Sequence, residues 1–255
     1  MKRYFDIERI NKRDKIVATI GSFDGVHRGH VAILQKTVAE AERLKGKSLV
    51  ISFITHPREV INPDFHFKKL SRIIEKEKHF STLGINKILY LPFNKQIAAM
   101  TYVSFLETLS QHFCLHTLVM GYNNTFGHNR DGNLNAIKQL EEFSNLQLIQ
   151  VAAQYYKGEP ISSSRIRRTL EAGDIRNANK MLGYAYTITA FAIKNGTKGV
   201  YGLFDGEQLL PKNGRYITLI KGKPIEVKIK NNHIYIMEKL NYYNTLLMIT
   251  FIDYR

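Results

Sequence analysis

The stretch Gly21-Ser22-Phe23-Asp24-Gly25-Val26-His27-Arg28-Gly29-His30 determines how this chain folds. It follows a short run of apolar, β-branched residues, 16–20, and precedes a segment, 30–44, whose apolar residues have the spacing of a one-faced helix. A strand that leads through a glycine-containing turn into a helix directs backbone N–H groups and the positive helix end toward one point. Glycine also lets a ligand approach the backbone without meeting a Cβ atom. The stretch therefore predicts a phosphate-binding loop that comprises Gly21, Ser22, Phe23, Asp24, Gly25 and Gly29.

The alternation of strand and helix continues to about residue 182. Further strands are predicted at 48–53, 87–91, 117–120 and 147–151, and further helices at 72–83, 102–113 and 134–143. Strands that alternate with helices of this length form parallel βαβ units, and burial on both faces explains why the strands are apolar throughout. We therefore expect an α/β, Rossmann-like domain, in which a parallel sheet has helices on both faces.

The pattern changes after Gly183. Short β-type runs separated by glycine and asparagine follow, at 186–189, 215–220, 224–229, 233–236 and 245–252. The pair Asn231-Asn232 between two of these runs predicts a hairpin, because asparagine tolerates positive φ in a two-residue turn. The sequence thus predicts a first domain at 1–184 and a small antiparallel β-barrel-like domain at 185–255.

Composition sets limits on location and partners. The 255 residues include 37 Lys plus Arg against 22 Asp plus Glu, which favours phosphorylated or polyanionic partners, although a generally basic surface is the alternative. Because the positive residues are scattered, nucleic acid is not expected as a partner. Cys114 is the single cysteine, which excludes an intramolecular disulfide and a cysteine-based zinc site. Without a signal-peptide pattern or a long apolar run, a cytoplasmic location with no membrane contact is expected.

The stretch that forms the predicted loop contains two histidines that could take part in catalysis. His27 and His30 are three residues apart at the start of the predicted helix, so both imidazoles can face one phosphate. Imidazole N–H groups can stabilise the charge that develops on the α-phosphate of ATP under attack. A glycine-rich turn with two incidental histidines is the alternative. Because strand, turn and helix onset coincide here, we predict that the loop is a catalytic site for ATP.

A second polar cluster, Ser162-Ser163-Ser164-Arg165-Ile166-Arg167, opens a predicted helix after the fifth strand. Serine at a helix start is an ordinary N-cap. Three serines followed by two arginines also suit phosphate, because hydroxyl and N–H groups bind its oxygens while guanidinium neutralises its charge. The sequence alone leaves cap and phosphate site as alternatives.

These motifs, in this order, resemble those of bacterial FAD synthetases over about residues 14–186. The loop resembles the family's G-x-F-D-G-x-H-x-G-H signature, and 162–167 resembles its S-S-[ST]-x-I-R motif. Phe53-Ile-Thr-His56-Pro57 is similar to F-x-P-H-P, Leu91-Pro-Phe-Asn94 to L-P-F-D, and Gly121-Tyr-Asn123-Asn-Thr-Phe126-Gly127 to G-x-[DN]-F-x-F-G. The resemblance implies a nucleotidyltransferase that adenylylates FMN.

The resemblance also implies a mechanism and its residues. The phosphate of FMN would attack the α-phosphorus of ATP, with Mg²⁺ assisting, to give FAD and pyrophosphate. The residues that it implies are His27, His30 and Arg167 for catalysis, Ser163, Ser164 and His56 for the phosphates, Asn123 and Phe126 for the flavin, and Asn123 for the metal. His56 as a loop-ordering residue and Asn123 as a turn former are the alternatives.

The chain departs from the family in three places. Asn94 replaces the usual acid, and Asn124-Thr125 replaces a more aromatic or basic pair, which bears on the exact substrate. In the tail, the riboflavin kinase motif Pro-Thr-Ala-Asn does not occur, so kinase activity is expected to be absent. A transferase acting on another small phosphate ester, and a non-catalytic regulator that binds flavin or RNA, remain as alternatives. Oligomeric state is not defined by the sequence.

Overall fold

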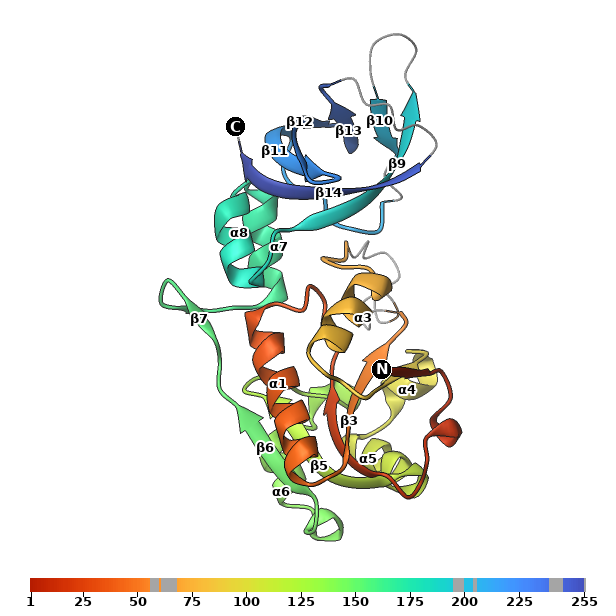
Figure 1. Cartoon of the computed structure of the whole chain (residues 1–255). Coiled ribbons are helices and arrows are strands. Elements are labelled where there is room, and N and C mark those ends of the chain that lie inside the picture. The colour runs from red at the N-terminus through yellow and green to blue at the C-terminus, as the bar shows by residue number, and fades with distance from the viewer. Residues whose placement is uncertain (56–59, 61–67, 195–199, 204–205, 239–244, 255) are drawn as a thin grey trace. The chain divides into compact units, whose positions relative to one another are not determined.

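The computed structural model describes residues 1–55, 60, 68–194, 200–203, 206–238 and 245–254 (Figure 1). By its internal contacts, the chain divides into two compact units. The first comprises Met1–Phe67 with Ile73–Gln154, and the second comprises Lys68–Arg72 with Tyr155–Arg255. No helix within the described ranges combines the length and the apolar character needed to cross a lipid bilayer.

The first unit contains a six-stranded sheet in which all paired strands are parallel. Its strands are β1 (Lys2–Tyr4), β2 (Lys15–Ile20), β3 (Lys47–Phe53), β4 (Lys87–Leu91), β5 (Cys114–Gly121) and β6 (Gln147–Val151). Five of them lie where the apolar runs predict strands. The sequence pattern missed β1, because three residues are too few to show a periodicity.

Helices cover both faces of this sheet, which confirms the predicted α/β class. They are α1 (Arg28–Arg43), α3 (Ile73–Thr82), α4 (Lys95–Ala99), α5 (Tyr102–His112) and α6 (Leu134–Lys138), with 3₁₀ turns at Ile7–Arg9, His128–Arg130 and Glu141–Phe143. On one face, Leu109 of α5 packs against Ala18 and Leu118. On the other, Leu34 of α1 packs with Val50.

The predicted helix 134–143 is wrong in its length. Helix α6 ends at Lys138, because Leu140 adopts an extended backbone with ψ 109°. A 3₁₀ turn follows over Glu141–Phe143. Leu140 and Phe143 pack against the same apolar cluster as Leu109, so core packing overrides the helical pattern here.

The strand order β1-β4-β3-β2-β5-β6 determines where a ligand can bind in this unit. From β2 the chain crosses to β3 on one side, and the later strand β5 pairs with the other side of β2. The order of strands reverses at β2, and parallel sheets bind ligands at such a point, beyond the carboxyl ends of the strands. The segment that follows β2 is the predicted phosphate loop.

The second unit contains a closed antiparallel barrel of order β10-β13-β12-β11-β14-β9, which confirms the predicted barrel-like domain (Figure 1). Its strands are β9 (Thr187–Lys194), β10 (Val200–Leu203), β11 (Gly214–Ile220), β12 (Lys223–Lys230), β13 (His233–Ile236) and β14 (Thr245–Tyr254). The predicted hairpin joins β12 to β13, and Asn231 and Asn232 have φ of 50° and 62°.

Two helices before the barrel share its core. Leu170 of α7 (Ser163–Glu171) and Met181 of α8 (Ile175–Leu182) belong to one apolar cluster with Val227 and Phe251 of the barrel. A short hairpin of β7 (Tyr155–Tyr156) and β8 (Glu159–Pro160) precedes them. Packing therefore separates the units near residue 154, while a domain boundary near residue 184 stays a prediction.

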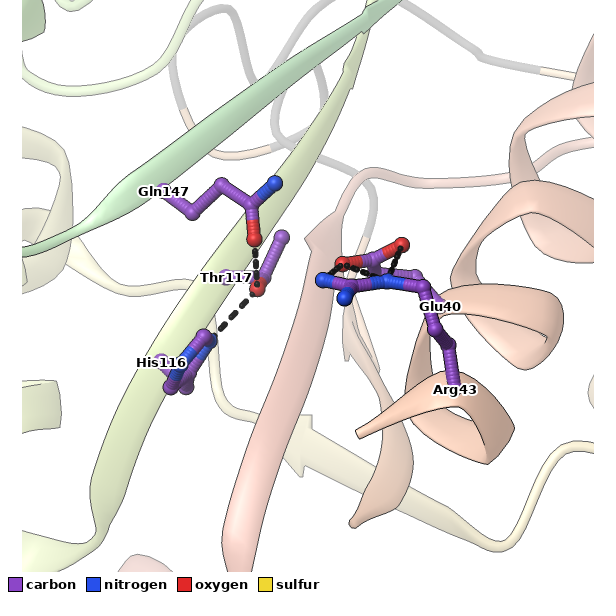
Figure 2. Close-up of polar contacts among 5 residues, drawn as sticks. All are labelled: Glu40, Arg43, His116, Thr117 and Gln147. Atoms are coloured by element: carbon purple, nitrogen blue, oxygen red, sulfur yellow. Dashed lines mark hydrogen bonds and ion pairs between the residues drawn. The ribbon is translucent and has the colours of Figure 1, made fainter. Parts of the chain in front are cut away.

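A buried carboxylate lies at the carboxyl-terminal end of α1, about three turns away from the predicted phosphate loop. The Glu40 side chain is 5% exposed and accepts hydrogen bonds from Arg43 Nε at 3.1 and 3.0 Å (Figure 2). On the neighbouring β5, Thr117 Oγ1 donates to Gln147 Oε1, and His116 Nδ1 lies 2.9 Å from that hydroxyl. The hydrogen bond from Arg43 holds the pKa of Glu40 below its usual value, and His116 acts in the same direction.

This shift predicts a pH-dependent contribution to stability. A carboxyl group whose pKa is lower in the folded state stabilises the fold above its unfolded pKa of about 4.3, and the contribution is lost as the pH falls through the folded value. We expect Glu40→Gln to lower the thermal unfolding midpoint at pH 7, and the difference from wild type to shrink below about pH 4. The exposed neighbour Glu42→Gln is the control and should leave the midpoint unchanged. Equal midpoints of wild type and Glu40→Gln at pH 7 would contradict this role.

Candidate active site

The loop after β2 has an unusual backbone. Phe23 has φ 48°, Gly25 has φ 80° and Val26 has φ 30°. For a β-branched or bulky residue a positive φ is rare, and it persists only where the surroundings hold it in place. The side chains of Phe23 and Val26 supply part of that hold, because both are buried in the apolar cluster between the sheet and α1 and α3.

Hydrogen bonds from three different elements hold the ends of the loop. The N–H of Gly21 donates to the carbonyl of Ile51 on β3 at 3.0 Å. Asn124 Nδ2, beyond the end of β5, donates to the carbonyl of Ile20 at 2.8 Å. Lys76 Nζ on α3 donates to the carbonyl of Ser22 at 3.1 Å. The predicted phosphate loop is therefore fixed by the sheet and by α3.

The two predicted histidines lie together at the start of α1. His27 is the N-cap residue, and its Nδ1 accepts from the N–H of His30 at 3.3 Å. The two rings stack with their centroids 3.6 Å apart and their planes at 17°. Because Nδ1 is the acceptor, a neutral His27 carries its proton on Nε2, which is inferred from the hydrogen bond. Both rings therefore lie at the end of α1 where the helix dipole is positive.

The remaining loop residues follow the same turn. Asp24 and Gly25 are buried, while Ser22 and Gly29 are partly exposed. The rings of Phe23 and His30 meet at a steep angle, with 5.2 Å between ring centroids and 68° between ring planes. A Cβ atom added to Gly21 would meet the Phe23 ring at 3.2 Å, so glycine is favoured there by close packing.

The residues predicted for the flavin side follow β5, the strand beside β2. Asn123 is exposed in the turn after Gly121. Phe126 packs against Phe105 at 5.8 Å, and its backbone pairs with Gly132, so a structural role accounts for its position. Its contact with flavin stays a prediction, and His56 lies outside the described residues.

Two of the residues that depart from the family pattern, Asn94 and Asn124, have local structural tasks. Asn94 is the N-cap of α4, where its Oδ1 accepts from the N–H of Ile97 at 2.9 Å. Asn124 holds the end of β2 through its contact with Ile20. Both side chains therefore fix the backbone at the carboxyl edge of the sheet.

The serine-arginine cluster lies in the second unit, at the start of α7. Ser162 is the N-cap residue, and its Oγ accepts from the N–H of Arg165 at 3.2 Å, which confirms the cap for this serine. Ser163 and Ser164 follow in the first turn, and Arg167 Nε donates to the carbonyl of Lys68 at 3.1 Å.

The side chain of Arg165 is occupied within the β7–β8 hairpin. Its Nη1 donates to the carbonyls of Tyr156 and Glu159 at 3.0 and 2.9 Å, and its Nε lies 3.2 Å from a carboxylate oxygen of Glu159. The guanidinium of Arg165 is therefore bound by the hairpin and does not need a phosphate to balance it. The sequence alone allows both Arg165 and Arg167 to bind phosphate.

A metal site made from protein groups alone is not found in the described ranges, where no three His, Cys, Asp or Glu residues are placed to share an ion. The exposed Asn123 has an amide oxygen near the carboxyl edge of the sheet, and Mg²⁺ can bind this type of oxygen. Magnesium bound mainly through nucleotide phosphates fits such a site, because Mg²⁺ usually takes one or two protein ligands beside substrate oxygens.

Two residues that hold the loop, Lys76 and Asn124, were missed as site residues by the sequence reasoning. Their contacts join segments that are far apart in the sequence, and local patterns do not reveal such contacts. The local sequence gives no signal for Lys76, because the apolar residues Ile73 and Ile74 of α3 are exposed, whereas Lys76 is buried beside Phe80.

A parallel sheet with the predicted phosphate loop at its switch point and two imidazoles at the following helix start is the arrangement expected of a nucleotidyltransferase. The family model for FAD synthetase matches residues 9–165. The chain therefore belongs to the FAD synthetase family.

Individual relatives agree with this assignment. The chain is 27% identical over 226 residues to the bifunctional riboflavin kinase/FMN adenylyltransferase of Buchnera aphidicola, covering 86% of this chain and 72% of that protein. It is 29% identical over 203 residues to an FAD synthetase of Listeria monocytogenes, covering 79% and 80%. The match to the bifunctional enzyme of Escherichia coli covers 59% of that protein. A crystal structure of a macrolide-efflux protein from Streptococcus pneumoniae shares the fold, with a TM-score of 0.87, 20% identity, and 100% and 90% coverage of the two chains.

The positive φ of Gly25 predicts that this loop does not tolerate a side chain. Gly25→Ala forces an L-residue into the left-handed region at a cost of about 1–2 kcal/mol, so we expect the loop to relax and ATP binding to weaken about tenfold. Gly222→Ala is the matched control, because Gly222 has φ 77° in a barrel turn with open space around a Cβ. Titration calorimetry with ATP tests this, and equal affinities for both variants would contradict it.

Proposed function

We propose that this protein transfers AMP from ATP to FMN, with Mg²⁺, and releases FAD and pyrophosphate. The observation that carries the proposal is the stacked pair of His27 and His30 directly after the phosphate loop. The proposal is also supported by membership in the FAD synthetase family and by the names of its relatives.

The reaction requires no covalent intermediate on the protein. A phosphate oxygen of FMN forms a bond to the α-phosphorus of ATP, and the bond from that phosphorus to the oxygen bridging the β-phosphate breaks. Positioning and charge stabilisation are sufficient for this type of transfer. The N–H groups of His27 and His30 would donate to the α-phosphate oxygens, where negative charge increases as FMN attacks. Bound Mg²⁺ would neutralise phosphate charge, with Asn123 as its proposed ligand on the protein.

Ser163, Ser164 and Arg167 are the groups that we propose for the leaving pyrophosphate. Ser163 and Ser164 lie in the first turn of a nine-residue helix, where backbone N–H groups and the helix dipole favour anions. Arg167 would add a guanidinium charge. Arg165 is not proposed for this task, because the hairpin already binds its guanidinium.

We further propose that the barrel lacks riboflavin kinase activity. The motif Pro-Thr-Ala-Asn, whose threonine and asparagine bind Mg·ATP in the kinases, is absent from the sequence. A cytoplasmic location also stays a prediction.

Product analysis tests the transferase. With FMN, ATP and Mg²⁺, we expect chromatography to show FAD and pyrophosphate in equal amounts, and His27→Ala to lower kcat by about 10²–10³, the effect of removing one preorganised donor. Because His27 also caps α1, His27→Asn is the matched variant, since asparagine can cap a helix but lacks the imidazole N–H. Equal losses in both variants assign the effect to the imidazole. No FAD from the wild type would overturn the proposed activity.

The kinase proposal has a separate test. Incubation with riboflavin, ATP and Mg²⁺ should leave riboflavin unchanged, because the residues that bind Mg·ATP in the kinases are missing. Supplying FMN to the same preparation confirms that the enzyme is active. Formation of FMN from riboflavin would show that the barrel is a kinase.

A further inference from the structure

Lys76 is a buried cation beside the phosphate loop. It is 7% exposed, on the face of α3 that packs against the sheet. Removing an ammonium group from water is costly unless it is hydrogen-bonded, so a buried lysine requires well-placed acceptors. The carbonyl of Ser22, 3.1 Å from Nζ, is such an acceptor, and it belongs to the loop itself.

This contact fixes the orientation of a peptide group in the loop. In a trans peptide, the carbonyl and the following N–H point in opposite directions. Because the carbonyl of Ser22 is directed to Lys76, the N–H of Phe23 is directed away from α3. Phe23 has positive φ. When a residue with positive φ adjoins a residue with the usual negative φ, the successive backbone N–H groups point into one concavity that can bind an anion.

A second contact from the same helix holds the next residue. Phe80, one turn after Lys76 on α3, forms a T-shaped contact with the ring of Phe23, with 5.8 Å between centroids. Residues four apart lie on one face of a helix, so Lys76 and Phe80 together hold Ser22 and Phe23. Helix α3 therefore contacts the strained part of the loop through one polar and one aromatic side chain.

We propose that Lys76 is a positioning residue for the triphosphate of ATP. It holds the peptide between Ser22 and Phe23 so that the N–H faces the phosphates, and its charge lies beside the loop that receives them. The inference rests on the proposed function for the identity of the ligand. It adds a cation from α3 to the groups of the phosphate loop and the two histidines.

Four variants of the full chain separate this role from general stability. Lys76→Met removes the donor and the charge at similar length, Lys76→Gln keeps a donor, and Lys76→Arg keeps both. Lys78→Met is the control, because Lys78 is exposed on the same helix. The measurements are the Kd for ATP by titration calorimetry, and KM for ATP and for FMN in the FAD-forming reaction.

We expect Lys76→Met to raise the Kd and KM for ATP by about 10- to 100-fold, the equivalent of a hydrogen bond to a charged group, with KM for FMN unchanged. Lys76→Arg should recover most of the affinity, Lys76→Gln should be intermediate, and Lys78→Met should match the wild type. A merely structural lysine would not separate the two KM values. If Lys76→Met fails to fold, Lys76→Gln decides.

Unchanged ATP affinity in Lys76→Gln, together with unchanged affinity in any folded Lys76→Met, would overturn the role of Lys76. A wild type that binds ATP but forms no FAD would overturn the proposed function alone, since the affinity comparison still tests the lysine. A wild type that does not bind ATP would overturn both.

Discussion

The positive φ angles of Phe23 and Val26 are the constraint on which the candidate site depends. Neither residue adopts such a backbone readily, so its neighbours must hold it. The sheet holds the end of β2, the turn after β5 holds Ile20, and α3 holds Ser22 and Phe23. Donors fixed before the ligand arrives need no reorganisation during the reaction, which is how preorganised groups lower a barrier.

Most of the fold could be predicted from the sequence because parallel strands buried on both faces leave apolar runs. Strand β4 lies at the predicted residues, and α1 begins two residues before its predicted start. The failures have physical causes. Strand β1 is too short to show a pattern, and the helix after Leu134 ends early because Leu140 turns its side chain into the core.

The candidate site could be predicted only where its residues are close in the sequence. The stacking of His27 and His30 follows from a spacing of three at a helix start. Lys76 and Ser22 are 54 residues apart, so their contact exists only once α3 has packed on the sheet. From the sequence, Ser162 could be either a helix cap or a phosphate ligand. The hydrogen bond that its Oγ accepts from the N–H of Arg165 identifies it as the cap.

Helices α7 and α8 bury their apolar side chains in the same cluster as the barrel strands. Asn179 of α8 donates from Nδ2 to the carbonyl of Phe251, and its Oδ1 accepts from the N–H of Tyr186. A lineage that lost the barrel would expose the apolar faces of both helices, including the turn that carries Ser163 and Ser164. The barrel is therefore part of what folds α7 and α8, whether or not it has an activity of its own.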